Sequence, residues 1–150
     1  MALRQIRIDG DEILRKNCKE IKEITENIKV LAEDMIETMN SANGVGLAGP
    51  QVGILKQIVV IDVGEGPMVL INPKIVKTKG EQLNPEGCLS IPGKSGEVKR
   101  PAYVKAEALN LDGEKIVVEG RELLAVALCH ETDHLKGRLF TDIAENIVQE

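Results

Sequence analysis

The stretch RELLAVALCHETDHLKG, residues 121–137, determines the fold of this chain. Residues 123–129 are apolar on every side of a helix, which predicts a helix that runs through the core and not along the surface. Gly137 is typical of the residue that ends a helix, because glycine adopts the left-handed backbone conformation without strain. The chain is therefore expected to fold around one buried helix.

The segments on the N-terminal side predict one further helix and several strands. Apolar residues recur at steps of three and four over residues 25–40, which is typical of an amphipathic helix, and Asn43 and Gly44 mark its end. A short last helix is expected over residues 142–149. Val- and Ile-rich or alternating runs predict strands at 57–62, 68–71, 103–108 and 115–119, the last two joined by a hairpin turn. The expected class is α+β, with antiparallel strands packed around the central helix.

The size and composition indicate a soluble globular protein. The 150 residues match one domain, expected to span residues 1–150, and 43% of them are hydrophobic and 29% charged. No apolar run approaches the ~18 residues of a membrane span, and the N-terminus lacks the apolar core of a secretion signal, so a cytoplasmic location is expected. The formal net charge of -5, with one Tyr, one Phe and no Trp, argues against nucleic-acid binding by a basic excess or by stacking rings.

The central helix ends in a metal-binding pattern. His130-Glu131-Thr132-Asp133-His134 fits His-Glu-x-x-His, in which the two histidines lie on one face of a helix and can reach one metal ion. Glu131 then stands beside a metal-bound water. The alternative is a pair of partly buried histidines without a metal, but the pair uses both histidines of the chain and follows an apolar helix into the interior.

A catalytic site of this kind usually takes three protein ligands, so a third donor is expected elsewhere. Cys88, in Glu86-Gly87-Cys88-Leu89-Ser90, is the candidate, because it follows a flexible glycine between segments that resemble strands. The alternative for Cys88 in isolation is a small buried apolar residue, and Cys18 and Cys129 keep that interpretation.

A glycine-rich segment extends from Gly44 to Gly53, with four glycines in ten residues. Glycine allows close backbone approach, which suits a loop that pairs with an extended peptide. No Lys-Ser or Lys-Thr follows the segment, and it comes after a helix, so neither a phosphate loop nor a dinucleotide site is expected. The alternative is an ordinary turn between a helix and a strand, although the polar Gln51 is unusual there.

The glycine-rich segment 44–53, the segment 86–90 around Cys88 and the segment 130–137 together resemble the peptide deformylases, of the bacterial type 1 kind, in order and approximate spacing. The similarity continues through Ile71-Asn72-Pro73, Arg100-Pro101 and residues 137–142, and so covers nearly the whole chain. One difference is Gly49, where the family most often has Ala. The resemblance implies a hydrolase that removes the N-formyl group from the initiator methionine of new polypeptides and releases formate.

The resemblance also implies roles for individual residues. Cys88, His130 and His134 would bind one divalent metal, Fe²⁺ first, with Zn²⁺, Ni²⁺ or Co²⁺ as substitutes. Glu131 would be the general base and acid, and Gln51 and the backbone N–H of Leu89 would stabilise the oxyanion. The residues expected to bind substrate are Gly44, Val45, Gly46, Leu47, Glu86 and Gly87, and the candidates for an apolar pocket are Val45, Leu47, Leu124, Val126 and Ala127.

Two other functions use the same residues. A zinc endopeptidase shares His-Glu-x-x-His, although a third ligand 42 positions upstream does not match its common arrangement. A metal or redox sensor would use Cys88 without catalysis. The expected partners are formylated nascent peptides; residues 141–150 contain no basic residue for docking on ribosomal RNA, so any ribosome contact needs another surface and is expected to be weak.

Overall fold

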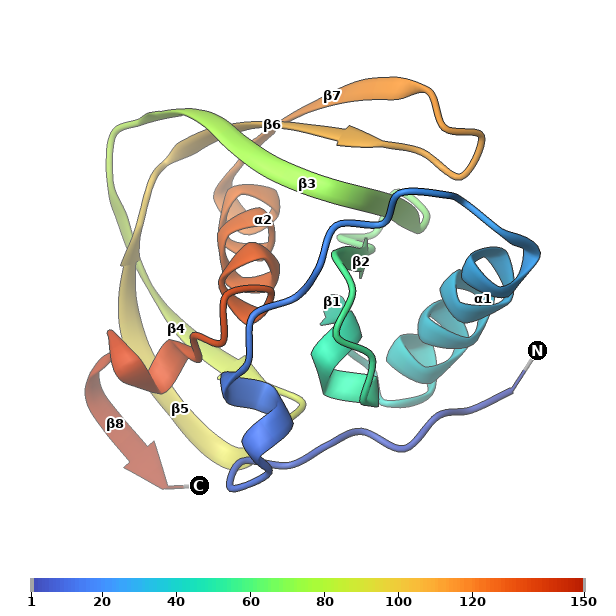
Figure 1. Cartoon of the computed structure of the whole chain (residues 1–150). Helices are drawn as coiled ribbons and strands as arrows, with labels where there is room; N and C mark the ends of the chain where they lie inside the picture. The colour runs from blue at the N-terminus through green and yellow to red at the C-terminus, as the bar shows by residue number, and fades with distance from the viewer. Residues whose placement is uncertain (1, 150) are drawn as a thin grey trace.

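Two antiparallel sheets surround one helix (Figure 1). The computed structural model describes residues 2–149. The larger sheet has the order β1-β2-β3-β6-β7, formed by β1 (Gly46–Ala48), β2 (Ile58–Ile61), β3 (Met68–Lys79), β6 (Tyr103–Leu109) and β7 (Lys115–Arg121). The smaller sheet has the order β4-β5-β8, formed by β4 (Gln82–Cys88), β5 (Ile91–Arg100) and β8 (Glu145–Gln149). The helices are α1 (Glu26–Ser41) and α2 (Glu122–His134), with short 3-10 helices η1 (Glu12–Arg15), η2 (Gly49–Val52) and η3 (Phe140–Asp142).

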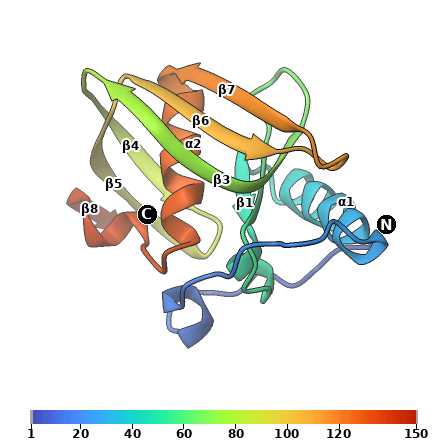
Figure 2. The same cartoon turned by 45° about the horizontal axis from the view of Figure 1, so that its top comes forward.

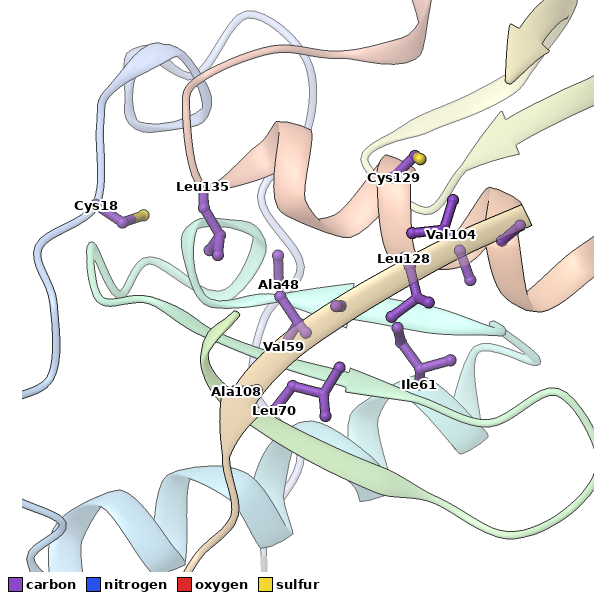
Figure 3. Packing of buried hydrophobic residues seen from close by; sticks show 13 residues of the cluster. Cys18, Ala48, Val59, Ile61, Leu70, Val104, Ala108, Leu128, Cys129 and Leu135 are labelled. Carbon is purple, nitrogen blue, oxygen red and sulfur yellow. The ribbon is translucent and has the colours of Figure 1, made fainter. Parts of the chain in front are cut away.

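Helix α2 is the buried central helix that the sequence predicts. Residues 125–132 are all buried, and strands β3, β6 and β7 pass in front of α2 in Figure 2. Figure 3 shows Leu128 of α2 pointing toward Ile61 of the larger sheet, and both side chains are fully buried. Burying one such side chain contributes about 1.5–3 kcal/mol to folding, so this cluster fixes α2 against the sheet.

The end of α2 also follows the prediction. Gly137 has a φ of 75°, the left-handed conformation expected after a helix. The N–H of Gly137 donates to the carbonyl of His134, and the N–H of Arg138 donates to the carbonyl of Asp133, at 3.1 and 3.0 Å. These two bonds satisfy carbonyl groups at the helix end and turn the chain away from the last histidine.

Helix α1 covers the other side of the larger sheet at its β1–β2 end, and its bounds are within one residue of those predicted. The Thr25 side chain caps its first turn by accepting from the N–H of Ile28. Met35 and Met39 are fully buried against β2. The helix ends before Asn43, which takes a φ of 57°, and the chain then enters the glycine-rich segment.

The final helix expected over residues 142–149 is wrong. Glu145–Gln149 form strand β8, which pairs antiparallel with β5. A helix of eight residues is too short to be stable without a buried face, and every residue of β8 is exposed. Pairing with β5 satisfies the backbone groups instead.

The hairpin of β4 and β5 forms two strands that the sequence did not predict. Prolines at 85 and 92 and glycines at 87, 93 and 96 are typical of turns, yet 17 residues here lie in two paired strands. Strand β3 likewise continues past its predicted end at residue 71 to Lys79, with a register irregularity between Ile71 and Lys74. Strand β4 ends at Cys88 and so places this residue at the site, and the β4–β5 hairpin forms the wall opposite α2.

Gly49 lies in close backbone packing. A Cβ atom at this position would be 2.7 Å from the carbonyl oxygen of Ile54 and 2.8 Å from that of Lys56. The methyl group of alanine would therefore require the following loop to move away.

Among residues 2–149, neither α1 nor α2 has the length and apolar character that a membrane-spanning helix needs.

Candidate active site

Cys88 and the two histidines meet at one point. His130 and His134 are four residues apart on α2, so both rings leave the same face of the helix, and Cys88 is the last residue of β4. The Nε2 atoms of the two rings are 3.2 Å apart, and Sγ of Cys88 is 3.4 Å from Nε2 of His134. The three donor atoms all lie within 4.8 Å of one another.

This donor set fits one divalent metal ion. A thiolate with two imidazoles is a set that iron and zinc accept. Burial and the charges of His130 and Arg100 hold the pKa of His134 well below its usual range, so its ring stays neutral and offers a lone pair. In the part of the chain that the structure describes, Nδ1 of His134 has no hydrogen-bond partner, and its Nε2 faces the other two donors.

Glu86 orients the first histidine. Its carboxylate lies 2.9 Å from Nδ1 of His130, which leaves Nε2 of that ring directed at the other donors. Burial opposes a charge on His130, but the negative charge of Glu131 and the hydrogen bonds with Cys88 and Glu86 outweigh it and hold the pKa of His130 well above its usual range.

Arg100 in turn fixes Glu86. The guanidinium donates to both carboxylate oxygens of Glu86 at 2.8 and 2.9 Å, and to Asp133 of α2 at 2.8 Å. Burial alone would raise the pKa of Glu86, but the hydrogen bonds from Arg100 and His130 lower it, so the carboxylate stays charged. Hydrogen-bonded charged side chains thus link β4, β5 and α2 behind the three candidate ligands.

Glu131 is buried beside the ligands. It is 4% exposed, and its Oε1 has no hydrogen-bond partner among residues 2–149. Burial raises the pKa of Glu131 to about 7, which allows the carboxyl to take up and release a proton near neutral pH. A Cβ atom at Gly46 would lie 2.9 Å from Cγ of Glu131 and overlap the carboxylate, so only glycine fits at that position.

Gln51 reaches the site from η2. Its Oε1 accepts from the N–H of Ala48 at 3.0 Å, which fixes the direction of the amide. Its Nε2 donates to Ser90 at 3.1 Å and to Sγ of Cys88 at 3.5 Å. Since Gln51 is 1% exposed and held at both ends, its amide N–H groups are fixed beside Cys88.

A cleft of about 410 Å³ opens in front of these residues. Val126 and Ala127 line it as expected, together with Leu123, which the sequence did not indicate. Leu47 does not line it, because its side chain is fully buried against α1, and Leu124 packs into the core instead. The other expected site residues that line the cleft are Gly44, Val45, Gly46, Gln51, Glu86, Gly87, Cys88, Leu89, His130 and Glu131.

Three residues of the site were missed by sequence reasoning. Arg100, Asp133 and Ser90 contribute no group to the cleft or the metal, and act by holding Glu86, α2 and Gln51. Ser90 and Asp133 stand inside the motif segments and Arg100 in the Arg100-Pro101 pair, but no pattern there indicated which side chains they hold. The side chain of Glu86 is committed to Arg100 and His130, so a contact of this residue with substrate would rest on its backbone.

Comparison with known proteins identifies a family over the whole chain. The family described as polypeptide deformylase matches residues 3–150. The peptide deformylase of Acetivibrio thermocellus is 67% identical over 150 residues, which cover 100% of this chain and 88% of that protein. Peptide deformylase 1 of Clostridium acetobutylicum is 61% identical over 142 residues, which cover 95% of each protein.

Solved structures agree with this result. The peptide deformylase of Thermotoga maritima superposes with a TM-score of 0.93 and 41% identity, covering 95% of this chain and 98% of that chain. The peptide deformylase of Synechococcus elongatus, solved in complex with actinonin, gives a TM-score of 0.91 and 43% identity, covering 94% of this chain and 78% of that chain.

Proposed function

The chain belongs to the polypeptide deformylase family, and on this basis we propose that it removes the N-formyl group from the initiator methionine of newly made polypeptides. The C–N bond of the formamide is hydrolysed, formate is released, and the methionine is left with a free amine. The observation that carries the proposal is the convergence of Cys88, His130 and His134 beside the buried Glu131, at the wall of an open cleft.

Cys88, His130 and His134 would hold one divalent metal ion. A bound ion supplies Lewis acidity and lowers the pKa of a coordinated water to about 7, which provides a strong nucleophile at neutral pH. We propose Fe²⁺ as the resident ion, with Zn²⁺, Ni²⁺ or Co²⁺ as substitutes. With an ion bound in place of the proton on His130, a thiolate and two neutral rings would leave the site with a charge of about +1, which suits either iron or zinc.

Glu131 would move the proton of the reaction. Its buried carboxyl, with a pKa of about 7, accepts a proton from the attacking water and then transfers it to the nitrogen of the departing amine. The absence of a side chain at Gly46 leaves room for this carboxyl beside the cleft.

Gln51 and the backbone N–H of Leu89 would stabilise the negative charge that develops on the formyl oxygen. Gln51 suits this role because its amide is fixed before substrate arrives, by Ala48 on one side and Ser90 on the other. Donors held in advance are worth about 3–4 kcal/mol each in such reactions.

The glycine-rich segment would grip the peptide. Gly44, Val45 and Gly46 line the cleft, and we propose that their backbone groups pair with the substrate backbone. The apolar side chains of Leu123, Val126 and Ala127 line the same cleft, and we propose that they receive the methionine side chain.

Incubation with formyl-Met-Ala-Ser and with an unformylated internal peptide tests this function. Formate release from the first peptide, with the second left intact, is the expected result. A zinc endopeptidase would cleave only the internal peptide, and that outcome would refute the deformylase assignment.

A further inference from the structure

The outer side of β3, β6 and β7 faces away from α2. Val104, Ala106 and Ala108 of β6 are buried toward the helix, so the alternate residues of this strand point outward. Residues that are paired across neighbouring strands point to the same face of the sheet. The partners of the outward residues of β6 on β3 and β7 therefore also point outward. The outward residues of the three strands are Lys74, Lys77, Lys79, Tyr103, Lys105, Glu107, Leu109, Lys115, Val117, Glu119 and Arg121.

This outer side is strongly basic on an acidic protein. It carries six of the 19 lysines and arginines of the chain, but only two of its 24 acidic residues. None of the six takes part in an ion pair within 4.0 Å in residues 2–149. We call this surface the basic face, and its cations are Lys74, Lys77, Lys79, Lys105, Lys115 and Arg121.

Lys74 and Lys105 lie opposite Glu107 and Glu119, but one cross-strand pair of these cations is unfavourable. Lys77 of β3 is paired directly with Lys105 of β6, and like charges opposite each other destabilise a sheet. Lys79 and Arg121 lie 5.7 and 5.0 Å from the centroid of the Tyr103 ring, and these favourable cation–π contacts hold two more cations side by side on the surface. A bound polyanion would relieve this repulsion.

We propose that the basic face is a docking surface for the phosphate backbone of double-helical RNA. Alternate lysines on a strand are about 7 Å apart and project from a flat, rigid sheet. Such an array can contact several phosphates at once, and Lys binds phosphate as a point charge. Double-helical RNA is recognised mainly by its shape, its phosphates and its 2′-hydroxyls, so no set of stacking rings is needed.

The net charge of -5 does not prevent this contact. At 0.15 M ionic strength the screening length is about 8 Å, and charges on the far side of the molecule are largely screened. The sequence argument against nucleic-acid binding used totals for the whole chain. Whole-chain totals do not show where the charges lie, and here the alternation of side chains along the strands places six cations on one surface of the sheet.

The basic face and the cleft do not compete for space. No residue of the basic face lines the cleft, whose walls come from the glycine-rich segment, the β4–β5 hairpin and the opposite side of α2. A molecule docked through the basic face would therefore keep its cleft open. If the proposed action on nascent peptides is correct, the RNA in question is the ribosomal RNA that surrounds the substrate.

Fluorescence anisotropy with a labelled 20-base-pair RNA duplex tests the proposal. We expect an association constant that falls roughly 100-fold between 50 and 200 mM KCl, as release of about four counterions predicts. Lys77→Ala with Lys105→Ala should lower the slope of log K against log salt by about 2. The matched control is Lys22→Ala with Lys29→Ala, which removes the same charge from exposed positions at the α1 side of the molecule and should leave the slope unchanged.

Three results would overturn the proposal. These are absence of duplex binding at 50 mM KCl, an equal loss in the control variant, and tighter binding to vesicles with 30% phosphatidylserine or to polyglutamate than to RNA. Formate release from free formyl-Met-Ala-Ser should be the same in both double variants. Normal formate release without RNA binding would refute this inference alone, whereas RNA binding without formate release would refute the proposed function alone.

Discussion

At the scale of single residues, the close packing of Gly46 against Glu131 is a strict steric requirement of the site. The carboxyl is 4% exposed, although Glu131 lines the cleft, and it lies directly against β1. A glycine on β1 leaves the space that the carboxyl occupies. The proposed general base and the proposed peptide-binding segment thus meet at this glycine.

Gly46→Ala should therefore impair catalysis far more than folding. The added methyl group would displace the carboxyl of Glu131, and we expect kcat/KM for formyl-Met-Ala-Ser to fall by about 10–100-fold, since small displacements of a catalytic group have effects of this size. Overpacking should lower the free energy of unfolding by only about 1–3 kcal/mol. Metal content should not change. An unchanged kcat/KM would show that Glu131 is not confined by this contact.

The two cysteines outside the site differ from Cys88 in their surroundings. Burial raises the pKa of the Cys18 thiol and of the Cys129 thiol to about 11. Both groups therefore remain protonated and unreactive at pH 8, and only above pH 9 does the thiolate fraction become appreciable.

Alkylation followed by intact-mass measurement checks these pKa shifts. In chelator-treated native protein at pH 8, iodoacetamide should add one group within minutes, at the half-buried Cys88. Labelling of Cys18 and Cys129 should become faster as the pH rises from 8 to 11. In 6 M guanidinium chloride all three cysteines should react. Rapid native labelling of Cys129 at pH 8 would contradict its buried position.

At the scale of elements, the connection between β5 and α2 passes through one buried guanidinium. Arg100 is 5% exposed and binds Glu86 and Asp133 together. The position of His130 thus depends on a residue 30 positions earlier in the chain, through Glu86.

Arg100→Met should weaken both folding and metal binding. The buried carboxylate of Glu86 and the partly buried carboxylate of Asp133 would lose the guanidinium, which costs about 3–5 kcal/mol for a buried pair. Metal affinity should fall about 10–100-fold, because Glu86 would no longer hold His130 in a fixed orientation. Guanidinium unfolding and metal competition measure the two effects.

Arg138→Met is the matched control for this change. The Arg138 side chain is 55% exposed and lies 3.8 Å from Asp133, so its loss should alter stability by less than about 0.5 kcal/mol. Equal effects of the two variants would contradict the positioning role of Arg100.

The elements differ in how well the sequence predicted them. Helices α1 and α2 have long apolar patterns and clear ends, and both are found as expected. The β4–β5 hairpin was not predicted as strands, because its prolines and glycines are typical of turns and its pairing depends on contacts across the sheet. The His-Glu-x-x-His motif could be read from its spacing, whereas Cys88 was only a candidate until the family resemblance implied it as the third ligand. The role of Arg100 could not be read, because it arises only from the register of β5 beside β4.

At the scale of the whole molecule, backbone hydrogen bonds of the N-terminal residues 2–9 connect three separate parts of the fold. The backbone N–H of Ala2 donates to Asp34 of α1, the N–H of Arg7 to the carbonyl of Gln51, and the N–H of Asp9 to the carbonyl of Ser90. These three bonds connect α1, η2 and the β4–β5 turn. We propose that residues 1–150 form one folding domain, because the site draws ligands from both the smaller sheet and α2.

Metal binding should stabilise this domain as a unit. Ligands from β4 and α2 come together only in the folded state, so metal at 100 times its dissociation constant should add about 2.7 kcal/mol to the free energy of unfolding. A chelator should then lower the Tm by roughly 5–10 °C. Cys88→Ala should abolish this difference, whereas Cys18→Ala should retain it. A chelator-dependent shift that persists in Cys88→Ala would exclude the cysteine as a ligand.

The central claim is that Glu131 moves the proton at a metal site built by Cys88, His130 and His134. Measuring metal content and formate release together in Glu131→Gln tests it most directly. The account predicts metal content equal to that of the unaltered protein, with kcat for formyl-Met-Ala-Ser lowered by about 10²–10⁴-fold. Turnover within a few-fold of normal, at full metal content, would contradict it and favour a site that binds metal without this catalysis.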